Sequence, residues 1–141
     1  MINTMNPLLN SWFSLIGGAL GTTSVFISES VPESYTGHYV ELRCEGETED
    51  DTKHSFRSDN VVITDIVTQF NMAIDKTFAE SIDGIIKNLV RPTPGSIGLP
   101  AQSGIQILSV IPETTTYLEE YSSGKKYYRK IVRYKHRIIQ T

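Results

Sequence analysis

Cysteine and long apolar runs are scarce in this sequence. A single cysteine, Cys44, among 141 residues excludes an intrachain disulfide and a cysteine-based zinc cluster within one chain. The apolar stretch from Leu8 to Leu20 is interrupted by polar residues and is shorter than the ~20 residues of a membrane span. Residues 1–7 contain no Lys or Arg, unlike the start of a secretory signal. We therefore expect no membrane partner and synthesis into the cytoplasm.

Motifs that carry catalysis are also missing. The glycine-rich segment Gly17–Thr23 lacks the lysine of a phosphate-binding loop and follows a predicted helix instead of a strand. Asp65 lies in a predicted strand with no histidine or second acid at a spacing that would make it a base. Cys44 falls on the apolar face of its strand, where a thiolate is disfavoured. The sequence predicts no enzymatic activity, no cofactor and no metal site.

Length and composition are those of an ordinary globular protein. The apolar fraction of 39% and the charged fraction of 21% are close to globular averages, and 141 residues is near the commonest domain size. We expect one domain covering residues 1–141.

Two segments have the apolar spacing of helices. In the first, Asn6 is expected to cap the helix, Pro7 to occupy its first position, and the glycines from Gly17 to end it. The second runs from Phe78 to Leu89, with Thr77 and Glu80 as a capping box and Pro92 beyond its end.

Strand patterns occupy most of the remaining chain. They are expected at Ser24–Val31, Tyr39–Glu45, Asn60–Phe70, Ile105–Ile111, Thr114–Tyr121 and Lys125–Gln140, the fourth and fifth being separate strands or one strand bent at Pro112. The third is apolar on both faces, which predicts a central strand covered on both sides. Hairpin turns and few helices predict an α+β fold in which two helices pack on a mostly antiparallel sheet.

Two connecting segments have an unusual composition. Glu45–Lys53 has five acids in nine residues and no apolar residue, so we expect a solvated hairpin tip. Arg91–Gly104 has three prolines and three glycines, and its length makes it a candidate contact arm.

Positive charge concentrates at the end of the chain. Of thirteen Lys and Arg residues, seven lie between Lys125 and Arg137, although the net charge is -3. Read at a period of two, the last strand places a cationic stripe on one face, consisting of Arg129, Arg133, Lys135 and Arg137. Three interpretations stay open: contact with a nucleic-acid backbone, contact with an acidic surface of a neighbouring subunit, or matching to acids on the adjacent strand, such as Glu119 and Glu120.

The layout of these elements resembles the tail terminator and tail completion proteins of tailed bacteriophages. The resemblance rests on the order of elements along nearly the whole chain, on Val62–Ile66 leading into the second helix, and on the pair Tyr117–Glu120 and Arg129–Tyr134. It implies a tail-terminator-like domain in a virion, at the head–tail junction, that forms a hexameric or larger ring. Its neighbours would be the portal-side connector and the tail, with DNA passing through the lumen without sequence recognition.

The leading hypothesis is therefore a ring subunit in which acids of one copy meet the cationic stripe of the next. The candidate interface or DNA-channel residues are Arg129, Arg133, Lys135, Arg137, Glu47, Glu49, Asp50 and Asp51. The alternative is a small cytosolic nucleic-acid-binding module that uses the same stripe, with Tyr127 and Tyr134 available to stack on bases.

Overall fold

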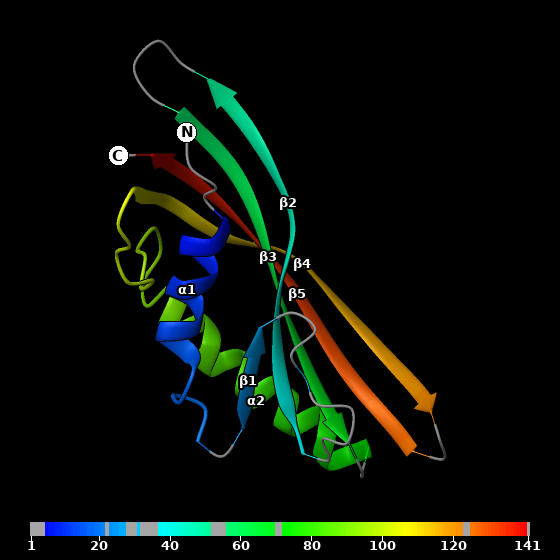
Figure 1. The fold of residues 1–141 in the computed structure, drawn as a ribbon. Coiled ribbons are helices and arrows are strands. Elements are labelled where there is room, and N and C mark those ends of the chain that lie inside the picture. Colours follow the sequence, from blue (N-terminus) through cyan, green and yellow to red (C-terminus); the bar gives the residue numbers. More distant parts are fainter. Residues whose placement is uncertain are drawn as a thin grey trace.

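The structure is a computed structural model, and it describes residues 5–21, 23–27, 31, 37–51, 56–69, 72–122 and 125–140. Its elements follow the chain in this order: α1 (Met5–Ile16), β1 (Ser24–Ile27), β2 (Tyr39–Asp51), β3 (Phe56–Gln69), α2 (Met72–Val90), β4 (Ile105–Ser122) and β5 (Lys125–Gln140). The strands form one five-stranded sheet in the order β1-β2-β3-β5-β4 (Figure 1). All neighbours are antiparallel except β1 and β2, which are parallel. The predicted α+β class is confirmed.

Both helices lie on the same side of this twisted sheet (Figure 1). From α1, the Trp12 ring packs against Tyr134 and His136; from α2, Asp83 binds Lys130. Because side chains alternate between faces, these even-numbered β5 residues share one face of the sheet. The other face carries no described helix, and the prediction that β3 is covered on both sides holds only in part. On that face Val61 and Ile63 are half-buried, whereas Asp65 and Val67 are buried.

The core lies between the helices and the even-numbered face of β3 and β5. Its largest fully buried side chains include Trp12, Tyr134, Leu8, Ile16, Leu42, Ile66, Ile86 and Ile138. No described helix is long and apolar enough to cross a membrane.

A buried hydrogen-bond chain ties α1 to the last strand. The Trp12 indole N–H donates to Nε2 of His136 over 2.9 Å, so this nitrogen must be an acceptor. The proton of His136 is then on Nδ1, which donates to the carbonyl oxygen of Asn60 at 3.1 Å. Burial lowers the pKa of His136 to about 4 and keeps the ring neutral.

Several local predictions need correction. α2 begins at Met72, so Thr77 lies inside the helix and forms no capping box with Glu80. The carboxylate of Glu80 instead accepts a hydrogen bond of 2.7 Å from Lys130 on β5. A distant partner therefore determines the role of this acid, and local spacing does not reveal it.

The predicted contact arm, Arg91–Gly104, is folded onto its own helices. Leu99 is buried in the core, and Ser11 of α1 donates a 2.6 Å hydrogen bond to the carbonyl of Pro100. The Gly98 N–H donates to Val90 over 2.7 Å. A side chain at Gly98 would clash, because an added Cβ would lie 1.7 Å from the Leu89 carbonyl oxygen.

The prediction of an acidic hairpin tip is also wrong in part. β2 continues through Glu45 to Asp51, and its backbone stays paired with Phe56–Val61 of β3. A register shift between Cys44 and Gly46 marks a β-bulge at Glu45. Residues 52–55, which join the two strands in the sequence, lie outside the described residues.

Candidate assembly interface

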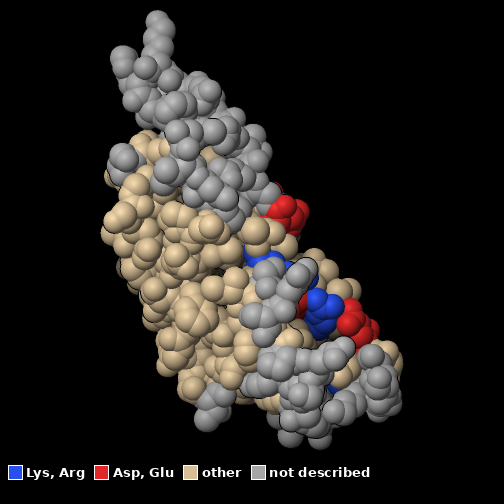
Figure 2. Space-filling view, viewed as in Figure 1, with Lys and Arg blue, Asp and Glu red and all other residues tan. Residues whose placement is uncertain are grey.

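The predicted cationic stripe exists as a row of side chains on the helix-free face of β5. Odd-numbered residues of β5 pair with odd-numbered residues of β3, for example Arg133 with Ile63 and Arg137 with Asp59. Arg129, Arg133, Lys135 and Arg137 therefore share one face, as the period of two predicted. In the surface view, however, residues of both signs gather in one band beside a largely uncharged surface (Figure 2).

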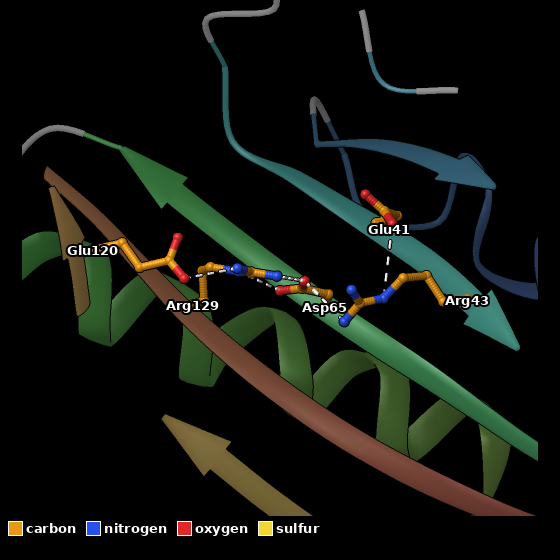
Figure 3. A network of polar contacts seen from close by, with 5 residues as sticks. All are labelled: Glu41, Arg43, Asp65, Glu120 and Arg129. Carbon is orange, nitrogen blue, oxygen red and sulfur yellow. Dashed lines mark hydrogen bonds and ion pairs between the residues drawn. The ribbon is translucent and has the colours of Figure 1, made fainter. Parts of the chain in front are cut away.

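Arg129 belongs to an alternating row of charges that crosses four strands (Figure 3). Its guanidinium makes two hydrogen bonds to the carboxylate of Asp65 on β3 and one of 2.9 Å to Glu120 on β4. On the other side of Asp65, Arg43 of β2 approaches to 3.2 Å and also pairs with Glu41 at 3.7 Å. The order is thus acid, base, acid, base, acid across the sheet.

Burial makes Asp65 the centre of this row. Its side chain is only 2% exposed, whereas those of Arg129 and Arg43 are 22% and 32% exposed. An isolated carboxylate would lose much hydration free energy there, and the two guanidinium groups compensate that loss. The hydrogen bond with Asp65 in turn raises the pKa of Arg129 above its ordinary value. The row is a stabilising structural network.

The other arginines of the stripe also have acidic partners within the chain. Arg133 lies 3.0 Å from Glu45 at the β-bulge of β2, and Arg137 lies 3.4 Å from Asp59 on β3. These pairs are partly exposed, and exposed pairs contribute little to stability. Lys135 is exposed and has no ion-pair partner among the described residues. Together with Arg137, Asp59 and Ile111 it lines a shallow depression of about 250 Å³.

The even-numbered face of β5 holds a second charged cluster, which sequence reasoning missed. Lys130 is 3% exposed and binds Asp83 at 2.8 Å and Glu80 at 2.7 Å, both on α2. Burial alone would lower the pKa of Lys130, but its hydrogen bonds to these two acids outweigh burial and raise it. The signal in the sequence was a lysine at an even-numbered position between Tyr128 and Val132.

The remaining candidate residues fall in different surroundings. The backbone at Glu47, Glu49, Asp50 and Asp51 is the outer part of β2, and their side chains lie outside what the structure describes. Tyr134 is fully buried, so it is not available to stack on bases. Cys44 is exposed, which corrects the expectation that it packs on the apolar face. Within the described ranges, no group of three His, Cys, Asp or Glu side chains is placed to hold a metal ion.

The outermost strand, β4, carries most of the exposed apolar surface. Seven large apolar side chains are exposed in the described part of the chain, and five of them belong to β4: Leu108, Ile111, Tyr117, Leu118 and Tyr121. β4 pairs with β5 on one side only and lies at the edge of the sheet. Long exposed apolar edges readily accept another strand, so this edge is the surface best suited to contact another chain.

Comparison with protein-family models finds no match, and comparison with curated proteins finds none either. The fold is similar to solved structures. One of these is a virion of a native gene transfer agent particle, in which one chain matches with a TM-score of 0.69 and 14% sequence identity. The match covers 100% of both chains. At this identity the similarity shows a common fold.

Proposed function

We propose that this chain is a structural subunit of a phage-like virion and forms a ring at the head–tail junction. The observation that carries the proposal is the full-length similarity of fold to a chain of a gene transfer agent virion, a phage-like particle. Agreement over both complete chains means that no domain or long insertion separates the two folds. The order of elements that resembles tail terminator proteins leads independently to the same class.

The surfaces of the molecule support a role in assembly. A subunit of this kind acts through its interfaces, and five of the seven exposed large apolar side chains in the described residues lie on one edge strand. Apolar surface concentrated in this way is typical of protein–protein contact sites. The portal-side connector and the tail are the expected neighbours above and below such a ring, and DNA would pass through its lumen without sequence recognition.

The charges favour this reading over the nucleic-acid-binding alternative. Binding to phosphates requires cations that are available to replace condensed counterions. Arg129, Arg133 and Arg137 already pair with carboxylates of their own sheet. A phosphate backbone would have to displace those carboxylates, and the buried Asp65 would then lose a partner. A function in catalysis is not part of the proposal.

Light scattering with negative-stain electron microscopy tests the ring. The purified chain is measured over a range of concentrations at low and moderate salt. Closed rings, or monomers that form rings as the concentration rises, are expected. A monomer at every concentration and salt that retains DNA at low salt would overturn the proposal in favour of the nucleic-acid-binding module.

Antibody labelling tests the position in the particle. Particles released by cells that carry the gene are labelled with gold-coupled antibody against the chain and imaged. Label is expected where the tail meets the head. Label along the tail shaft, or over the capsid, would contradict the junction.

A further inference from the structure

The two open edges of the sheet run in opposite directions. Because β2, β3, β5 and β4 are successively antiparallel, β4 is antiparallel to β2. Two copies placed side by side in the same orientation would therefore bring antiparallel strands together at their facing edges. A rotation about an axis roughly along the strands preserves this orientation, and such head-to-tail contacts close into rings.

One of these edges is the outer part of β2. β1 pairs only with Tyr39–Leu42, so Arg43–Asp51 has no strand on its outer side within the described residues. This nine-residue segment contains five acids and one arginine. Its unpaired backbone groups are available for hydrogen bonds with an added strand.

The other edge is the first half of β4, Ile105–Pro112, in which the backbone of Ile105 also bridges Gln102. These eight residues contain no charged side chain, and Leu108 and Ile111 are 38% and 53% exposed. The acids of β4 all follow Pro112, and the register shift between Pro112 and Thr114 bends the strand at that point. The uncharged half can therefore follow a neighbouring edge while the acidic half diverges from it.

We infer that Ile105–Pro112 of one copy adds antiparallel to Arg43–Asp51 of the next copy, joining their sheets. The inference rests on the proposed ring and names its contact. The two segments match in length, eight and nine residues, and in strand direction. Their charges are compatible as well, because the acids of β2 face an uncharged strand. In such strand addition, main-chain hydrogen bonds provide the affinity and alternate side chains the specificity.

The chain's single cysteine allows a direct test. Cys44 is exposed and lies near the start of the free segment of β2. In the proposed antiparallel pairing, the end of the β4 segment, near Pro112, lies opposite Cys44. Pro112 pairs with Tyr134, Tyr134 with Val62 and Val62 with Cys44, so residues 44 and 112 are on the same side of the sheet. Ile111 pairs with Lys135 and is on the other side.

Cysteine is introduced singly as Ile107→Cys or Pro112→Cys on the Cys44 side, and as Ser109→Cys or Ile111→Cys on the opposite side. Each variant is oxidised mildly and run on a non-reducing gel. Pro112→Cys should give a ladder of covalent oligomers that ends at the ring size. The two opposite-side variants should not, and neither should Ile107→Cys, because position 107 lies about 17 Å from position 112 along the strand. A disulfide within one chain is excluded, because β3 and β5 separate β2 from β4 by roughly 14 Å and a disulfide spans at most about 7 Å between Cα atoms.

The outcomes separate the contact from the ring. If microscopy shows rings but Pro112→Cys does not cross-link, the strand contact is wrong and the proposed function stands. If the unmodified protein forms no rings, the proposed function itself is contradicted. The same variants with Cys44→Ser must lose the cross-link; dimers that persist without Cys44 would mean that two β4 strands pair with each other, which also overturns the inference.

Discussion

The neighbouring strands β5 and β4 differ in how their surfaces are used. β5 carries seven of the chain's thirteen Lys and Arg residues, yet it is an inner strand with partners on both sides. Its three odd-face arginines and Lys130 are bound to carboxylates of β2, β3, β4 and α2. β4 has only three acids and no Lys or Arg, but it lies at the edge with its apolar side chains exposed.

The difference shows that a conspicuous charge pattern need not mark an interaction surface. A row of cations in one strand is neutralised when the strands beside it supply acids at matching positions. The apolar edge strand β4 has no second strand beside it among the described residues, so its outer edge is open to another chain. Mutations on β5 should therefore change stability, and mutations on β4 should change association.

The largest effect on β5 is expected from the buried centre of the charged row. Arg129→Ala leaves the carboxylate of Asp65, which is 2% exposed, with Arg43 alone, and removal of one partner from a buried ion pair costs about 3 kcal/mol or more. Arg137→Ala is the matched control, because its pair with Asp59 is 55% and 34% exposed and should contribute less than about 1 kcal/mol. Urea unfolding measures both. Equal losses for the two variants would contradict the structural role of the row.

A pH effect of similar size is expected from His136. Its pKa is about 4 in the folded chain and about 6.5 when unfolded. Below pH 6.5 the unfolded state takes up a proton that the folded state does not, so stability falls as the pH drops from 6.5 to about 4. The full loss is about 3 kcal/mol. Above pH 6.5 His136 is neutral in both the folded and the unfolded state, so its titration does not change stability there.

The control for this pH effect is His136→Gln. The amide can accept from Trp12 and donate to Asn60 without titrating. The difference in unfolding free energy between the two proteins, followed from pH 7 to pH 4.5 in urea, isolates the histidine from the surface carboxylates. Parallel curves for the two proteins would mean that His136 does not stay neutral in the folded state.

A small effect is expected at the exposed pair of Arg133 and Glu45. Their side chains are 36% and 43% exposed, and pairs of this kind couple by about 0.5 kcal/mol. A double-mutant cycle with Arg133→Ala and Glu45→Ala, measured by unfolding at concentrations where the chain is monomeric, gives the coupling directly. A coupling above 2 kcal/mol would show that β5 arginines are energetically important even at the surface.

The smallest change in monomer stability, with the clearest loss of association, is expected on β4. Ile111→Lys alters a side chain that is 53% exposed, so the unfolding free energy should stay within about 0.5 kcal/mol. A lysine on an edge strand opposes strand addition, and rings should be lost. Ile85→Lys on α2, where the isoleucine is 39% exposed, is the matched control. If Ile85→Lys abolishes rings and Ile111→Lys does not, the contact lies on the helices.

Local patterns predicted much of this fold. The bounds of β5 agree with its alternation, Lys125–Gln140, and the bend of β4 falls at Pro112 because proline disturbs the ladder there. β2 was predicted too short, because acidic residues are uncommon in strands and the segment was expected to be a solvated turn. Its continuation from Glu45 to Asp51 depends on pairing with β3.

The sites that could not be predicted depend on residues far apart in sequence. Asp65 and Arg129 are 64 positions apart, and Trp12 and His136 are 124 apart. A single sequence contains no signal that connects such residues until the strand order is known. The cationic stripe was predicted correctly as a shared face, but its acidic partners on β2 and β3 could be identified only from the register. The edge position of β4 also follows from strand order alone.

The central position of β5 has a consequence for synthesis on the ribosome. β4 pairs with no described strand except β5, and β3 needs β5 on one side. Until β5 has left the exit tunnel, α1 cannot bury Trp12 against His136 and the edge offered by β4 does not exist. Chains that terminate before β5 would therefore lack the β4 edge, which is one of the two edges that the inferred contact between copies requires.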